Sequence, residues 1–253
     1  MISRAQIGLI KSLDQKKYRN QYKVFFVEGI KLVNELLISE FKLHSLFAVK
    51  EWAEMNSAIA SECKDKINLI TEKELKQISN LTTPNQVLAI FEIPEQKEFD
   101  FKQTDIILCL ESIRDPGNLG TIIRIADWYG IKNIFCSDDC VDVYNPKVVQ
   151  SSMGSIARVR VDYVDLKSFL NKLNGFHTYA TILSGKSIHS IKLEFPAAVI
   201  IGNESLGLTK EVAEICQHSI SIPKYGRAES LNAAMAAGII LDKFKLDSQI
   251  KQI

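Results

Sequence analysis

The feature that most constrains the fold is a series of short apolar runs in the second half of the chain. The segments "IILCLES" (106–112), "NIFCS" (133–137) and "AAVIIG" (197–202) lack the apolar–polar alternation of a half-exposed strand. Such runs are typical of a parallel sheet that helices cover on both faces. Helix-like segments separate the runs, so the pattern predicts an α/β domain built on a parallel sheet.

The length of 253 residues allows one large domain or two modest ones. Residues 1–95 alternate helix-like and strand-like segments, and the polar, charged stretch at 92–105, broken by Pro94, is the best linker candidate. We therefore predict a smaller α/β domain over residues 1–95, a linker over 96–104 and a larger α/β domain over 105–253.

The composition argues against several classes of protein. Apolar residues make up 46% and charged residues 24% of the chain, as in an ordinary globular protein. No apolar run reaches the roughly 18 residues of a membrane span. The N-terminus carries no secretion-signal pattern, so a cytoplasmic protein without a membrane partner is expected. The five cysteines are scattered, and Cys136 and Cys140 lack the second pair of a zinc site, so no metal is expected.

The N-terminal segment is basic, although the net charge of the whole chain is only +1. Residues 1–23 hold six Lys and Arg residues against one Asp, with Tyr18 and Tyr22 among them. Basic side chains neutralise RNA phosphates and aromatic rings stack on bases. The segment therefore suggests RNA binding through Lys16, Lys17 and Arg19. A solvated helix face explains the same charges and stays open as the alternative.

Three polar loops in the larger domain each follow a predicted strand. They are "DPGNLGTIIRIADWYG" (115–130), "IIGNESLGL" (200–208) and "IPKYGRAESLNAAMAAGI" (222–239), which we name the first, second and third loops. Ligands of open α/β sheets bind beyond the carboxyl ends of the strands, where such loops lie. The G-x-G-x-x-G and Walker fingerprints are both missing, which argues against a nicotinamide-dependent oxidoreductase or another common nucleotide-binding enzyme.

In order and spacing, the three loops resemble the signature motifs of the SpoU (TrmH-like) branch of the SPOUT RNA methyltransferases. "NPKVVQSSMGSI" (145–156) also matches the family pattern, and the resemblance covers residues 105–245. The N-terminal "KYRNQYKVFFVEG" (17–29) is similar to the family's accessory substrate-recognition domain. The resemblance implies a deep trefoil knot, in which the small residues at 233–238 would let a threaded helix approach neighbouring backbone. A tightly packed core helix of ordinary topology explains the same alanines.

The resemblance implies transfer of a methyl group from S-adenosylmethionine, without a metal, to a ribose 2′-hydroxyl of RNA by a homodimer. By analogy, the extra N-terminal domain favours ribosomal RNA over transfer RNA. The implied catalytic residues are Asn118, Arg124, Glu204, Ser230 and Asn232. The implied cofactor-binding residues are Thr181, Leu183, Gly185, Gly202, Asn203, Ile222 and Leu231. The implied RNA-binding residues are Lys16, Lys17, Arg19 and Arg124.

Several readings remain open beside ribosomal RNA ribose methylation. A transfer RNA 2′-O-methyltransferase would carry the same motifs, as would a catalytically silent RNA-binding protein of the same fold. An enzyme that methylates a base nitrogen is a third alternative, which Asn118 and Arg124 argue against. Ser230 also has the chemistry of a simple helix N-cap, whereas Asn232 then needs a separate reason.

Overall fold

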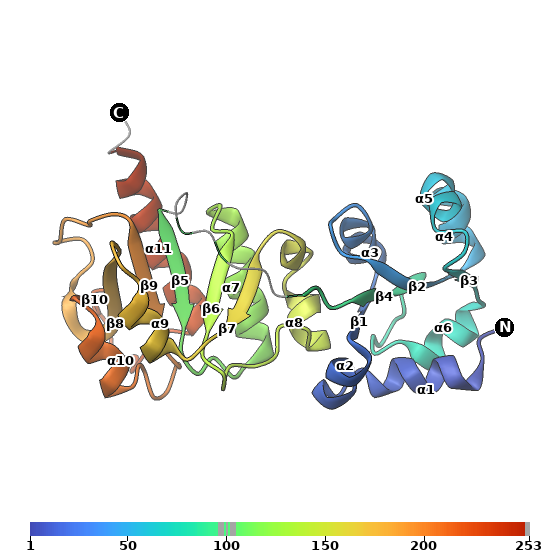
Figure 1. Ribbon diagram of the computed structural model, residues 1–253, viewed down its shortest axis with the longest axis horizontal. Helices are drawn as coiled ribbons and strands as arrows, with labels where there is room; N and C mark the ends of the chain where they lie inside the picture. Colours follow the sequence, from blue (N-terminus) through green and yellow to red (C-terminus); the bar gives the residue numbers. More distant parts are fainter. Residues whose placement is uncertain (96–98, 100, 102–104, 251–253) are drawn as a thin grey trace. The chain divides into compact units, whose positions relative to one another are not determined.

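The computed structural model describes residues 1–95, 99, 101 and 105–250, and the chain forms two compact units (Figure 1). The first unit holds Met1–Glu95 together with Tyr144–Ala157, and the second holds the rest of the described chain. The predicted linker at 96–104 lies outside the described residues, except for Phe99 and Phe101. Among the described residues, no helix is both long and apolar enough to cross a membrane.

The first unit is built on a four-stranded sheet with the order β1-β4-β2-β3. Strands β1 (Val24–Glu28) and β2 (Leu43–Ala48) each pair antiparallel with β4 (Val87–Glu92), and the short β3 (Ile67–Leu69) runs parallel to β2. All five residues of β1 are buried. The helices of this unit are α1 (Arg4–Ser12), α2 (Lys16–Tyr22), α3 (Ile30–Leu37), α4 (Lys50–Met55), α5 (Ser57–Glu62), α6 (Glu72–Ile78) and α8 (Pro146–Ser151).

Residues 144–157 pack with the first unit, although the sequence boundaries placed them in the larger domain. The ring of Tyr144 lies 4.6 Å from that of Phe25 in β1, and α8 packs against the same strand. Asn145 caps α8 by accepting a hydrogen bond from the Lys147 N–H, and Pro146 is its first residue. Helix α8 thus begins at a capped N-terminus and helps to cover β1, all of whose residues are buried.

The second unit confirms the predicted parallel sheet. Its six strands have the order β10-β8-β9-β5-β6-β7, and every neighbouring pair is parallel. Both β5 and β9 are buried along their whole length, which is why their sequences are apolar without alternation. The strands are β5 (Ile106–Leu110), β6 (Asn133–Cys136), β7 (Arg160–Tyr163), β8 (His177–Ser187), β9 (Ala197–Ile201) and β10 (His218–Ser221).

Helices cover both faces of this sheet. Helices α7 (Pro116–Trp128) and α11 (Ala233–Ile250) pack against each other (Figure 1). The Phe244 ring of α11 meets the Tyr179 ring of β8 edge-on, with the ring centroids 5.1 Å apart. Helices α9 (Leu166–Lys172) and α10 (Lys210–Ile215) cover the opposite face, above the core that Ile107, Phe135 and Ile200 share. The second unit thus has three layers, with the sheet between two layers of helices, and the three loops follow the carboxyl ends of the strands.

The small residues at the start of α11 do not all serve close backbone approach. Ala233, Ala234 and Ala237 are buried, but a Cβ on Gly238 would meet only the side chain of Ile125, at an ordinary 3.8 Å. The tight approaches lie elsewhere. A Cβ on Gly185 would come within 2.5 Å of the Ile220 backbone, so β8 and β10 fit together only because residue 185 has no side chain.

Candidate active site

The first loop leaves β5 and turns at once into α7. The Asp115 carboxylate caps the helix by accepting a hydrogen bond from the Asn118 N–H at 2.8 Å, and Pro116 provides the first helical residue. Asn118 therefore stands in the first turn of α7, at the carboxyl edge of the sheet. Arg124 lies further along the same helix and is exposed.

Asn118 connects the three loops through its side-chain amide. The amide nitrogen donates to the Glu204 carboxylate of the second loop, and the amide oxygen accepts from the Asn232 amide of the third loop at 2.7 Å. A carboxylate accepts but does not donate, so these partners fix which end of the Asn118 amide is nitrogen. Three of the five predicted catalytic residues are thus brought together by one side chain.

The second loop is folded around Asn203. The Asn203 side-chain oxygen accepts hydrogen bonds from the N–H groups of Ser205 and Leu206 at 2.9 and 3.1 Å. The Asn203 side-chain nitrogen donates to the Ser112 carbonyl at 2.9 Å. Gly207 closes the turn with a φ of +69°, a conformation that favours glycine. A Cβ on Gly202 would lie 2.4 Å from the Gly207 backbone, so the loop closes tightly on itself and presents Glu204 to Asn118.

Glu111 is a site-building residue that the sequence reasoning missed. It ends the buried strand β5, and its carboxylate accepts hydrogen bonds from the Thr209 backbone N–H at 2.8 Å and from the Thr209 hydroxyl at 2.7 Å. Thr209 in turn caps α10. The sequence did contain a signal for this residue, namely a single acid at the end of an apolar strand. A carboxylate that is buried there needs hydrogen-bond partners, so it indicates a contact with another segment. Its partner here anchors the second loop to β5.

Two titratable groups lie beneath the first loop. Burial opposes ionisation of Asp139, but hydrogen bonds from Ser112, Ser137 and Arg114 outweigh it and lower the pKa of that carboxyl. A hydrogen bond with Cys136 is the main cause that lowers the pKa of the buried Cys140 thiol to about 7. The Cys140 sulfur also accepts a hydrogen bond from the Ile113 N–H at 3.2 Å and so holds the backbone that leads into the loop, whereas Asp139 holds the side chains of Ser112 and Arg114.

Asn232, and not Ser230, caps the helix of the third loop. The Asn232 side-chain oxygen accepts hydrogen bonds from the N–H groups of Ala234 and Met235 at 3.0 and 3.3 Å. The capping role that the sequence left open for Ser230 therefore belongs to its neighbour. Ser230 is exposed, and its hydroxyl makes no hydrogen bond to any residue that the structure describes.

Arg124 is likewise not drawn into the network around Asn118. Its guanidinium has no hydrogen-bond or ion-pair partner within residues 1–95 and 105–250. A solvated cation on the same helix as Asn118 is suited to a ligand that carries negative charge, such as a phosphate group. The hydrogen-bond network around Asn118 and the guanidinium of Arg124 are therefore the groups available to contact a substrate.

The predicted cofactor residues lie within β8, directly after β9, directly after β10 and, for Leu231, further along the third loop. The Thr181 hydroxyl donates to the Ile200 carbonyl at 2.8 Å, while Leu183 and Leu231 leave 75% and 46% of their surface exposed. Ile222, Gly185, Gly202 and Asn203 are half-buried. Exposed apolar side chains beside glycine-lined backbone fit a flat ring with a polar edge, so the residues present are compatible with an adenosyl group.

One predicted RNA contact is wrong. The Arg19 side chain is buried, and it donates to the carbonyls of Leu13 and Asp14 at 2.6 and 2.9 Å. These carbonyls follow the end of α1, where backbone acceptors lack helical partners, so Arg19 completes the fold of the first unit. Lys16 and Lys17 are exposed, as predicted, and the Lys17 ammonium lies 5.7 Å from the Tyr18 ring centroid.

Comparison with known proteins assigns both parts of the chain. Residues 105–242 match the SpoU rRNA Methylase family, and residues 4–89 match the MRM3-like substrate binding domain. The chain is 31% identical over 236 residues to the 23S rRNA (guanosine(2553)-2′-O)-methyltransferase RlmP of Bacillus subtilis, covering 91% of this chain and 92% of that one. The crystal structure of the AdoMet-bound rRNA methyltransferase of Sinorhizobium meliloti superposes with a TM-score of 0.87 at 29% identity, covering 96% of this chain and 95% of that one. The match to the family spans more than half of the chain, includes all three loops and agrees with the fold, and the chain therefore belongs to the SpoU rRNA methylase family.

Proposed function

We propose that this protein transfers a methyl group from S-adenosylmethionine to a ribose 2′-hydroxyl of ribosomal RNA. The observation that carries the proposal is the Asn118 amide, which joins Glu204 and Asn232 from the other two loops, on the helix that also carries the exposed Arg124. The B. subtilis relative is a 23S rRNA 2′-O-methyltransferase, and the S. meliloti structure holds AdoMet.

S-adenosylmethionine supplies a methyl group that is already strongly electrophilic, so the protein has to position the ribose and assist loss of its proton. The backbone around Gly185, Gly202 and Ile222 would hold the adenosyl part, with Thr181, Asn203 and the side chains of Leu183 and Leu231 beside it.

Arg124 orients the substrate and stabilises charge. An arginine stays protonated in proteins and cannot act as the base, but its fork of donors matches a phosphate group. It holds the phosphate next to the target ribose and stabilises the negative charge that develops on the 2′-oxygen, while the proton passes to phosphate or water.

The remaining catalytic residues divide into positioning and contact roles. Asn118 uses one N–H and one lone pair on Glu204 and Asn232, which leaves one of each for the ribose. Glu204 and Asn232 act through Asn118 by fixing its orientation. The exposed Ser230 hydroxyl has no partner in the described chain and is assigned to contact the ribose.

Ribosomal RNA is favoured over transfer RNA by the first unit. The ribosomal RNA relative covers nearly the whole chain, whereas the Aquifex aeolicus TrmH/SpoU tRNA modifying enzyme covers 59% of it with a TM-score of 0.52. We assign RNA recognition to the unit that holds residues 1–95 and 144–157, with Lys16 and Lys17 as phosphate contacts.

A homodimer completes the proposal. Helices α7 and α11 expose large apolar side chains: 85% of Trp128, 62% of Met235 and 55% of Leu246. Exposed apolar surface on one pair of packed helices is typical of a protein–protein interface. We assign this surface to contact between two copies of the chain.

The decisive experiment maps the product. RNA methylated with labelled cofactor is hydrolysed in alkali, where a 2′-O-methyl group prevents cleavage of the adjacent phosphodiester. A labelled, cleavage-resistant dinucleotide from ribosomal RNA is the expected result. Label on a free base would overturn ribose transfer, and label on transfer RNA alone would overturn the choice of substrate.

A further inference from the structure

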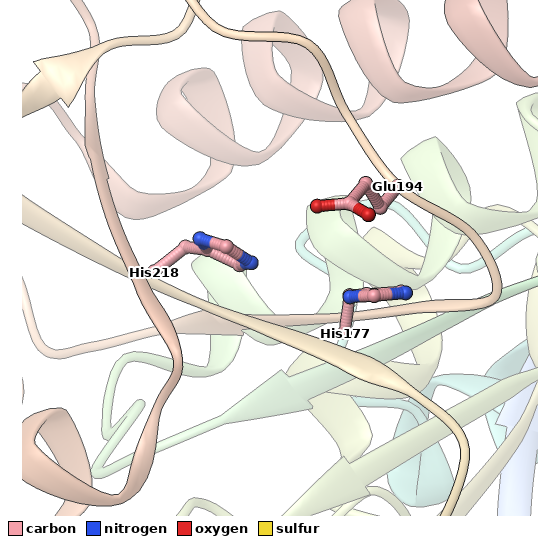
Figure 2. Close-up of side chains that lie close together, drawn as sticks. All are labelled: His177, Glu194 and His218. Atoms are coloured by element: carbon pink, nitrogen blue, oxygen red, sulfur yellow. The ribbon is translucent and has the colours of Figure 1, made fainter.

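Three side chains that methyl transfer does not use converge at the amino edge of the second unit's sheet (Figure 2). His177 begins β8, His218 begins β10, and Glu194 lies just ahead of β9. Their ring nitrogens and carboxylate oxygens all lie within 4.8 Å of one another. The three loops of the active site follow the carboxyl ends of the strands, so this cluster occupies the opposite edge of the sheet.

The strand register brings the two imidazoles together. His177 and Tyr179 are two residues apart on β8 and share one face of the strand. His218 pairs with Tyr179 across the parallel β8–β10 ladder, and its ring stacks on the Tyr179 ring at 4.8 Å. The His177 and His218 rings are 6.3 Å apart. The arrangement follows from the sheet itself and does not depend on a flexible loop.

Tyr179 also places the carboxylate. It is buried, and its hydroxyl accepts a hydrogen bond from the Glu194 backbone N–H at 2.8 Å. One rigid ring therefore supports His218 by stacking and fixes the backbone that carries Glu194. Phe244 packs edge-on against Tyr179 from α11, which holds the ring in place. Supports of this kind orient metal ligands in known sites.

The three side chains have no competing partners. Within the described residues, none of them makes a side-chain hydrogen bond or ion pair, and all three are at least partly exposed to solvent. Two imidazoles and one carboxylate are the ligand set that Zn²⁺ accepts in tetrahedral sites, whereas Mg²⁺ and Ca²⁺ prefer oxygen ligands alone.

We propose that His177, Glu194 and His218 form a zinc site, with water as the fourth ligand. Zinc bonds of about 2.1 Å place tetrahedral ligands about 3.4 Å apart, so donor atoms that lie within 4.8 Å of one another close by at most roughly 1.4 Å when the ion binds. Side-chain rotation of the exposed Glu194 supplies much of this movement. The ion ties the starts of β8 and β10 to the segment before β9, and β10 leads directly into the third loop. The ion lies at the sheet edge opposite the three loops, so methyl transfer does not use it.

The sequence alone gives no sign of this site. The short ligand spacings of familiar zinc motifs are missing, because the two histidines lie on separate strands with a helix and a further strand between them. Only the β8–β10 pairing makes them neighbours.

The test measures zinc binding by the full-length, tag-free protein. Calorimetry and metal analysis after dialysis against ZnCl₂ should give about one ion per chain. His177→Ala and His218→Ala should each weaken binding at least about 10-fold, because a ligand contributes at least as much as its supporting groups do. Glu194→Gln, which keeps the shape and removes the charge, should also weaken it. His189→Ala removes an exposed histidine of the same unit outside the cluster and should leave it unchanged.

Zinc should also raise the melting temperature of the wild type and of His189→Ala, but not that of the cluster variants, because an ion that binds only the folded state stabilises it. All variants should keep their S-adenosylmethionine affinity, which shows that they are folded. Failure of the wild type to bind zinc would overturn the proposal, as would equal binding by the cluster variants. If a histidine variant does not fold, Glu194→Gln decides the question alone.

Discussion

Asn118 and Asn232 lie 114 positions apart in the chain, and their side-chain amides are joined by a 2.7 Å hydrogen bond. This bond links the first turn of α7 to the residue that caps α11. It couples the geometry of the first loop to that of the third, with Glu204 attached to the same amide.

Replacing Asn118 by Ala should lower kcat/KM for methyl transfer about 10- to 100-fold, because a hydrogen bond to a charged group contributes about 1.5–3 kcal/mol. Asn232→Ala should have a similar effect. The loss of transition-state stabilisation in the double variant should be smaller than the sum of the losses in the two single variants, because each single variant already removes the Asn118–Asn232 hydrogen bond. Additive losses in this cycle would show that the two residues act independently.

Arg124→Ala should abolish transfer while S-adenosylmethionine affinity, measured by calorimetry, stays within a few-fold. The guanidinium holds the substrate phosphate and stabilises the charge that develops on the attacking oxygen, and neither task involves the cofactor. Arg124→Lys should recover little, because an ammonium cannot make the two-pronged contact. Lys210→Ala, which removes an exposed cation from α10, serves as the control and should transfer normally. A fully active Arg124→Lys would contradict the proposed role.

Replacing Lys16 and Lys17 by Gln should weaken the binding of ribosomal RNA fragments by a similar factor whatever their base sequence, because phosphate contacts do not read the bases. Each lost phosphate contact should reduce the slope of log affinity against log salt by about one unit. The matched control replaces two exposed lysines of α6, Lys73 and Lys76. An unchanged slope in the Lys16/Lys17 variant would mean that these charges form only a solvated helix face.

Arg19 should behave differently from its two neighbours. Arg19→Met should lower the free energy of unfolding by about 1–3 kcal/mol, because the Leu13 and Asp14 carbonyls lose their donor. Urea denaturation measures the change, with Lys17→Met as the comparison. A stability equal to wild type would show that the buried guanidinium is dispensable.

Glu111→Ala should reduce both stability and cofactor affinity. The carboxylate holds Thr209 through two hydrogen bonds, so its loss frees the second loop, which contributes Gly202 and Asn203 to the cofactor site. We expect a loss of about 1.5–3 kcal/mol in unfolding free energy. Thr209→Ser keeps the hydroxyl and should retain both properties. Normal cofactor affinity in Glu111→Ala would show that Glu111 does not anchor the second loop.

Light scattering should give twice the 28.5 kDa chain mass at micromolar concentration. Trp128→Glu and Met235→Glu should shift the protein toward monomer, since each places a charge in the proposed apolar interface. Leu69→Glu alters an exposed apolar residue of the first unit and should leave the mass unchanged. A wild-type monomer would exclude the dimer.

The sequence determined the parallel sheet and the positions of the three loops. Both follow from patterns within a few residues: strands such as Ile106–Leu110 are apolar because both of their faces are buried, Pro116 marks the start of a helix and Gly207 marks a turn. The resemblance of the loops to the family motifs identified the family for the same reason, since it depends on short strings of residues. The trefoil knot and the linker at 96–104 stay predictions.

Only the tertiary structure decided which side chains meet. The structure places the Arg19 side chain against the backbone at the end of α1, although Lys16 looks equivalent to Arg19 in the sequence. It assigns the cap of α11 to Asn232, although Ser230 looks equivalent to Asn232. It also paired Glu111 with Thr209 and brought His177 beside His218. The partners of Glu111 and His177 come from other elements, whereas those of Arg19 and Asn232 lie within six residues along the chain. In each case a polar group is satisfied by whatever the folded chain brings near it. A local pattern shows that a polar residue needs a partner, whereas the long-range packing of the folded chain determines which one it finds.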